Sequence, residues 1–131
     1  MTDQLITRLE QASAGLLFPS ESDAPLQVFV WRAAAPFSPA ALLGHIGCDQ
    51  TTPIRTTDVD RFFRPVTQAH PWDGPAEQER LRRFTTLVEL LKTELRDLTV
   101  YKIGTVAIDV YVVGRDENGT YLGVTTHVVE T

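Results

Sequence analysis

Apolar positions recur with two different periods along this chain, and each period predicts a type of element. A helix near the start is predicted by apolar residues at helical spacing, namely Leu5, Leu9, Ala12 and Leu16. The longest helical stripe follows Pro75 and consists of Leu81, Phe84, Leu87, Val88, Leu91 and Leu95. A shorter helix is expected over residues 38–47, where Ser38 is a candidate cap before a proline.

Other segments show the patterns of strands. Residues 26–31 are apolar on both faces, which predicts a strand inside a sheet. Residues 105–114 alternate, and the Asn118-Gly119 pair then signals a hairpin to a last strand. Between these regions, Thr57 and Asp60 are spaced like a capping box for one or two helical turns. The prolines and glycine of residues 64–75 predict a loop.

This order of elements predicts an α/β (α+β) fold in a single domain over residues 1–131. Helices are expected on both faces of a mainly antiparallel sheet that ends in a C-terminal β-meander. The length of 131 residues and a hydrophobic fraction of 43% are sufficient for one buried core.

Composition narrows the possible partners and compartment. Twelve basic and seventeen acidic residues give a net charge of −5, which disfavours direct binding of nucleic acid and suits a basic protein partner. Cys48 is the only cysteine, so no intrachain disulfide is possible. The start of the chain lacks the features of a signal peptide, and no apolar run reaches the ~20 residues of a membrane span. We expect a cytoplasmic protein without membrane contact.

Candidate chemistry is sparse. His45 and Cys48 lack the further ligands that a zinc site requires, and no motif for hydrolysis or phosphate binding occurs. We therefore expect no catalytic residues, no metal site of the protein's own and no cofactor. The alternative is a small hydrolase or metal-binding enzyme assembled by folding, which would use His45, Cys48, His70 or His127.

Two loops and the chain end are candidate contact sites. Glu21 lies in a short polar "SES" loop, which is either a solvated turn or a contact. Trp72 lies among prolines and glycine, and is either folded back over the core or an interface anchor. The last strand pattern runs without a polar tail to Thr131.

Three segments together resemble the cyanobacterial nuclease A inhibitor family: "LEQASAGLLFPSESDAPLQVFVW", "TDVDRFF" and "VYKIGTVAIDVYVVGRDENGTYLGVTTHVVET". The resemblance implies a three-layer α/β/α sandwich. It also implies a protein that plugs the active site of a magnesium-dependent, sugar-nonspecific DNA/RNA endonuclease of the ββα-metal class and performs no chemistry itself.

The resemblance assigns contacts to individual residues. Glu21 matches the acidic contact of the "SES" loop, Trp72 the loop tryptophan, and Thr131 the terminal residue that reaches the nuclease metal. Members of the family carry a carboxylate directly before the tryptophan, whereas this chain has Pro71 there and Asp73 directly after. Either Asp73 substitutes for that acid or the contact is missing. The alternative function is an interaction domain of the same fold whose protein target is different or lost.

Overall fold

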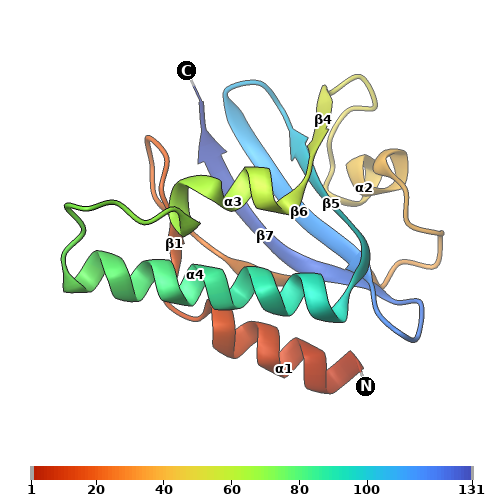
Figure 1. Cartoon of the computed structure of the whole chain (residues 1–131). Coiled ribbons are helices and arrows are strands. Elements are labelled where there is room, and N and C mark those ends of the chain that lie inside the picture. Colours follow the sequence, from red (N-terminus) through yellow and green to blue (C-terminus); the bar gives the residue numbers. More distant parts are fainter. Residues whose placement is uncertain (1, 131) are drawn as a thin grey trace.

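The computed structural model describes residues 2–130, and its centre is a five-stranded sheet in the order β3-β7-β6-β5-β4. All neighbouring strands are antiparallel. The strands are β3 (Gln27–Val30), β4 (Ile54–Thr57), β5 (Arg96–Ile103), β6 (Ala107–Arg115) and β7 (Tyr121–Val129). A separate two-stranded ribbon pairs β1 (Leu17–Phe18) with β2 (Ala24–Pro25). Strands β5 to β7 form the predicted C-terminal meander (Figure 1).

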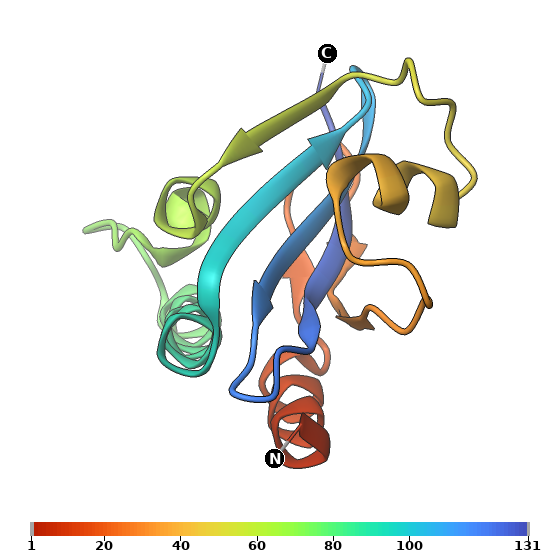
Figure 2. The same cartoon turned by 90° about the vertical axis from the view of Figure 1, so that its right-hand side faces the viewer.

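Helices cover both faces of the sheet. One face carries α1 (Thr2–Ser13), α3 (Val59–Thr67) and α4 (Pro75–Glu94), and the other carries α2 (Pro39–His45) (Figure 2). Each face has its own cluster of buried apolar side chains. This is the α/β/α arrangement expected from the sequence.

The larger core lies beneath α1, α3 and α4. Its fully or almost fully buried members include Leu9, Phe63, Phe84, Leu87, Leu91, Ile108, Val110, Val112, Leu122 and Val124. The alternation along β6 directs Ile108, Val110 and Val112 to this face, as the sequence pattern predicts. The smaller core beneath α2 consists of Phe29, Trp31, Leu42, Leu43, Ile103 and Val113.

Two local expectations are wrong. Strand β3 pairs only with β7 and is an edge strand. Its side chains are apolar on both faces because Phe29 joins the smaller core while Val28 and Val30 pack against the larger one. Helix α3 is capped by the side chain of Asp58, which accepts a hydrogen bond of 2.7 Å from the Arg61 backbone N–H, so the Thr57–Asp60 capping box does not form.

Helix α3 also continues into the segment expected to be a loop. Pro65 lies inside this helix, two residues before its end at Thr67. A proline removes one helical hydrogen bond and crowds the carbonyl four residues earlier. Burial of Phe62, Phe63 and Val66 in the core compensates for this local cost. The remaining loop is short, and it connects α3 to the predicted start of α4 at Pro75.

The expected hairpin after β6 is present. Within its turn the Gly119 N–H donates to the Asp116 carbonyl, and Gly119 has a φ of 79°. Arg115 and Tyr121 form the last strand pair before the turn. The five-residue connection therefore places glycine at the left-handed position. Among the described residues, no helix combines the length and apolarity needed to cross a membrane.

Candidate functional site

The Glu21 loop is fixed to the end of the last strand. It connects β1 to β2, and the Oγ atom of Ser20 accepts a 3.1 Å hydrogen bond from the Val129 backbone N–H. The same hydroxyl donates to the Ser22 carbonyl at 2.8 Å, which closes the turn. Glu21 is exposed between these two serines. The fold thus brings together two segments that are 109 residues apart in sequence.

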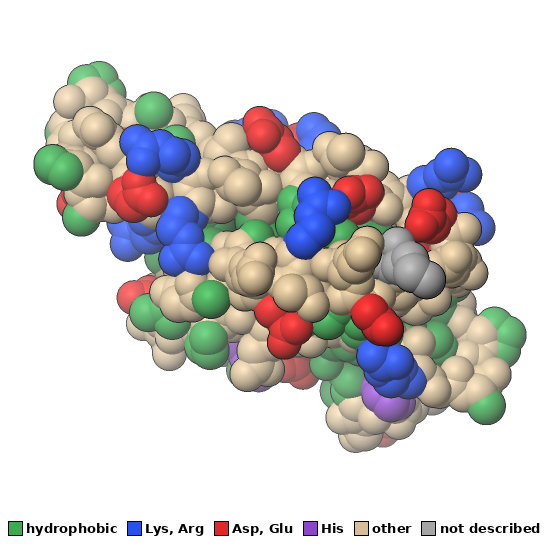
Figure 3. Space-filling view, turned by 90° about the horizontal axis from the view of Figure 1, so that it is seen from below, with side chains coloured by type: hydrophobic (Ala, Val, Ile, Leu, Met, Phe, Trp, Pro, Cys, Tyr) green, Lys and Arg blue, Asp and Glu red, His purple; other side chains and the backbone are tan. Residues whose placement is uncertain are grey.

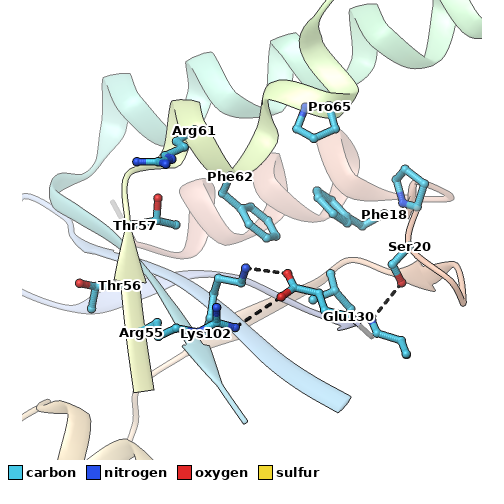
Figure 4. Close-up of a pocket in the computed structure, with 13 residues that line it drawn as sticks. Phe18, Ser20, Arg55, Thr56, Thr57, Arg61, Phe62, Pro65, Lys102 and Glu130 are labelled. Atoms are coloured by element: carbon cyan, nitrogen blue, oxygen red, sulfur yellow. Dashed lines mark hydrogen bonds and ion pairs between the residues drawn. The ribbon is translucent and has the colours of Figure 1, made fainter. Parts of the chain in front are cut away.

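The end of β7 is held on a second side by ion pairs. The Glu130 carboxylate accepts a 2.7 Å hydrogen bond from Lys102 Nζ and lies 3.4 Å from an Arg55 guanidinium nitrogen (Figure 4). The Glu130 backbone N–H also donates to the Val106 carbonyl at 2.9 Å. Arg55 and Lys102 are direct partners across β4 and β5, so the sheet places both cations beside the same carboxylate.

These contacts change the acidity of Glu130. The hydrogen bond from Lys102 lowers the pKa of Glu130, and this effect exceeds the opposing effect of burial. The charges of Lys102 and Arg55 lower the pKa further. Glu130 is therefore ionised near neutral pH. Ser20, Arg55 and Lys102 together form a clamp on the end of β7, and this clamp fixes the backbone direction of Glu130, the residue before Thr131. Thr131 itself lies outside the described residues.

Trp72 stands at the tip of a tight turn between α3 and α4. The Asp73 N–H donates to the His70 carbonyl at 3.1 Å, while the His70 N–H donates to the Asp73 carboxylate at 2.9 Å. The His70 and Trp72 rings stack with centroids 4.7 Å apart. Trp72 is 78% exposed, so its interpretation as a lid over the core is wrong.

The structure gives Asp73 a role within this turn, because its carboxylate holds the His70 backbone. A contact between Asp73 and a partner stays a prediction. The turn is close to the Glu21 loop, since His70, Asp73 and Pro19 line one small pocket of about 100 Å³. The β7 end, the β1–β2 turn and the α3–α4 loop all lie toward the same side of the molecule (Figure 1).

The residues that the enzyme alternative would use have other neighbours in the fold. His45 packs edge-on against Trp31, and Cys48 is partly buried beside the smaller core. His127 Nε2 lies 3.0 Å from an Asp109 carboxylate oxygen, a partner that sequence reasoning missed. The hairpin register pairs these two residues directly. Within residues 2–130, no group of three or more histidine, cysteine or acidic side chains is arranged to hold a metal ion.

The surface on the side of α1 differs from the β7 end in its distribution of charged side chains. Acidic and basic side chains are interspersed there (Figure 3), and ion pairs join Arg8 to Glu94 and Arg82 to Glu79. A surface of mixed sign has no strong field for a charged partner. The β7 end, with its clamped carboxylate, acidic loop and exposed tryptophan, is the stronger candidate for a contact surface.

Ser20, Arg55, Lys102 and Glu130 were not predicted as site residues. The pattern of β7 indicates only that a strand approaches the chain end, and no local signal reveals which loop or cation lies beside it.

Comparison with known proteins identifies the family. No curated protein matches the chain. The sequence model of the nuclease A inhibitor-like protein family matches residues 3–131, which is nearly the whole chain. The resemblance inferred from three segments therefore extends through the middle of the sequence. The chain belongs to the nuclease A inhibitor-like family.

Proposed function

We propose that this protein inhibits a magnesium-dependent, sugar-nonspecific endonuclease of the ββα-metal class by binding over its active site. Membership of the inhibitor-like family supports this role. In this proposal the protein acts in the cytoplasm, has no catalytic residues and needs no cofactor. Its partner is the nuclease, and it makes no direct contact with nucleic acid or membrane.

The proposed contacts are Glu21, Trp72, Asp73 and Thr131. A nuclease active site attracts phosphate, so it presents a metal ion and basic side chains. The Thr131 carboxylate supplies oxygen ligands, which Mg²⁺ prefers, and occupies the place of a substrate phosphate. Glu21 meets a basic group beside the active site. Trp72 supplies a large and rigid apolar contact, as the aromatic anchors of interfaces do.

One observation carries the proposal: the hydrogen bond from the Val129 N–H to Ser20 Oγ. It joins the acidic loop to the strand that leads to Thr131. A preorganised pair of contacts loses less conformational entropy on binding than two independent mobile segments. The clamp on Glu130 supports the same preorganisation.

Titration of a ββα-metal, sugar-nonspecific nuclease with the untagged protein tests this function. Residual DNA cleavage is followed in excess magnesium, and we expect stoichiometric loss of activity. A variant with two residues added after Thr131 should inhibit at least about a hundredfold less well, since burial of unpaired groups at an interface is costly. A variant with two residues added before Met1 is the matched control. Equal inhibition by both variants would count against the Thr131 contact.

The alternative function is an interaction domain of the same fold with a different or lost target. It is favoured by the turn around Trp72, because Pro71 occupies the position of the family's acid and Asp73 is bonded to His70. Pro71→Glu discriminates between the two functions. If the target is a nuclease and one contact is missing, this variant inhibits more strongly than the unmodified protein. If neither protein inhibits any nuclease of this class, the alternative is favoured.

A further inference from the structure

A pocket of about 600 Å³ lies beside the clamped end of β7, between α3, β4 and the β1–β2 turn (Figure 4). Its apolar wall includes Phe18 and Phe62, whose rings stack with centroids 4.6 Å apart. Its polar wall includes Arg55, Thr57, Arg61 and Lys102 from β4, α3 and β5, together with Ser20 and Glu130. The pocket thus has an apolar wall with two aromatic rings and a polar wall with three cationic side chains.

The charge of this pocket is opposite to that of the whole protein. Three cationic side chains line it against one carboxylate, whereas the chain carries a net charge of −5. Lys102 is bound to Glu130 at 2.7 Å, and Arg55 is the more distant partner at 3.4 Å. These two cations share the single carboxylate of Glu130, which leaves one positive charge there, and Arg61 adds a second.

The Arg61 side chain is a hydrogen-bond donor of the pocket that is available to a partner. Its backbone N–H is bonded to Asp58, but its guanidinium has no ion pair or hydrogen bond to any residue within the described part of the chain. The Thr57 hydroxyl likewise has no hydrogen bond to residues 2–130. The side chain of Thr56 lies on the opposite face of the sheet, because Thr56 pairs with Tyr101 of the smaller core while Thr57 pairs with Val100 of the larger one. The Thr57 hydroxyl points toward Arg61 (Figure 4), and a guanidinium with a hydroxyl group beside it can supply several of the hydrogen bonds that a carboxylate accepts.

The position of Arg61 constrains its partner. A nuclease groove that receives a nucleic acid is basic, so a free arginine docked against it is repelled unless it meets a carboxylate. Phe62 and Phe18 form an apolar wall of the same pocket, and an apolar wall lowers the local dielectric and strengthens an ion pair formed there. On the basis of the proposed function, we propose that this pocket receives an aspartate or glutamate side chain of the nuclease, bound by Arg61 with Thr57.

Charge reversal at Arg61 tests this inference. Inhibition constants are compared for the unmodified protein, Arg61→Gln, Arg61→Glu and the control Arg96→Glu. Arg96 is an exposed residue at the start of β5, at the opposite end of that strand from Lys102, and its reversal changes the net charge equally. We expect Arg61→Glu to weaken inhibition at least about tenfold, with Arg61→Gln intermediate and Arg96→Glu close to the unmodified protein.

The outcomes separate the inference from the function on which it rests. If Arg61→Glu inhibits as well as or better than the unmodified protein, Arg61 faces a basic surface and the inference is wrong, while the inhibitor function stands. If the unmodified protein does not inhibit, the function and the inference both fail. Thermal unfolding of each variant establishes that the fold is retained.

A second comparison excludes the chain's own terminus as the occupant. Arg61→Glu is combined with deletion of Thr131, and the two effects on inhibition should multiply, because they concern separate contacts with the nuclease. If Arg61→Glu has no effect once Thr131 is absent, Arg61 serves the terminal carboxylate and the inference is overturned.

Discussion

Ser20 and Val129 are joined by a 3.1 Å hydrogen bond from the Val129 backbone N–H to the Ser20 hydroxyl oxygen. Ser20 precedes Glu21, and Val129 is the last residue of β7. A single side chain therefore couples the acidic loop to the strand end. The orientation of the proposed binding surface depends on this contact between the two ends of the sequence.

Removal of this hydroxyl should affect inhibition more than stability. We expect Ser20→Ala to lower the free energy of unfolding by about 1–2 kcal/mol, because it removes the bonds of this partly exposed hydroxyl to Val129 and Ser22, each with a typical net value of ~1 kcal/mol. The loss of binding free energy should exceed this loss of stability, because the Glu21 loop and the β7 end are no longer held together. Denaturant unfolding and nuclease titration measure the two effects.

Ser22→Ala is the matched control, since the exposed Ser22 contributes its backbone, and not its side chain, to the turn. If Ser20→Ala and Ser22→Ala inhibit equally well, the coupling between loop and strand has no role in binding.

The clamp on Glu130 predicts a particular pH dependence. Lys102 lowers the pKa of Glu130 below its ordinary value of 4.5, so the contribution of this pair to stability is complete above pH 4.5 and is lost as the pH falls through the folded-state pKa. Both side chains are partly exposed, which limits the contribution to about 0.5–1 kcal/mol. Carbon-13 NMR titration of the glutamate carboxyl groups measures the pKa directly.

Lys102→Met should raise the pKa of Glu130 toward its ordinary value and reduce the loss of stability in acid. Lys92→Met removes the ion pair with Asp60 on the helical layer and serves as the control. An unchanged Glu130 titration in Lys102→Met would contradict the clamp.

Substitution of Trp72 distinguishes an effect on binding from an effect on folding stability. Because the side chain is 78% exposed, Trp72→Ala should change the free energy of unfolding by less than about 0.5 kcal/mol. As an interface anchor its loss should cost at least about 2 kcal/mol of binding, or roughly a thirtyfold higher inhibition constant. Trp72→Phe keeps an aromatic ring at this position and should restore part of the affinity. Full inhibition by Trp72→Ala would remove this residue from the contact surface.

Gly123 tests the packing of the central strands. A Cβ atom at this position would lie 1.7 Å from the Val112 carbonyl oxygen, which forces a shift of the sheet backbone. We expect Gly123→Ala to lower the free energy of unfolding by about 3 kcal/mol. Gly44→Ala is the control, because the nearest atom to its Cβ is 3.9 Å away and alanine favours the helix. Equal stability of the two variants in denaturant unfolding would show that the strands near Gly123 adjust easily.

Local sequence patterns determine much of the fold. The stripes of α1 and α4, the Ser38 cap of α2 and the alternation of β6 follow from contacts within a few residues, and the structure confirms them. The exceptions are Leu16 and Leu95, which were assigned to these stripes and lie just beyond the ends of the two helices. The short edge strand β4 lacks such a pattern, and its polar residues are specified by pairing with β5 instead. The end of α3 was misjudged because burial of Phe63 and Val66 outweighs the effect of Pro65.

The candidate site, like the fold, was predictable from the sequence only in part. By itself, the sequence identified the family, through the motifs around Glu21 and at the chain end, and it indicated that Trp72 is unusual. Only the tertiary structure decided that Ser20 binds Val129, that Lys102 and Arg55 share Glu130, and that Arg61 lacks a partner within residues 2–130. Such contacts join residues far apart in sequence, and their geometry depends on strand order and register, which local periodicity does not specify.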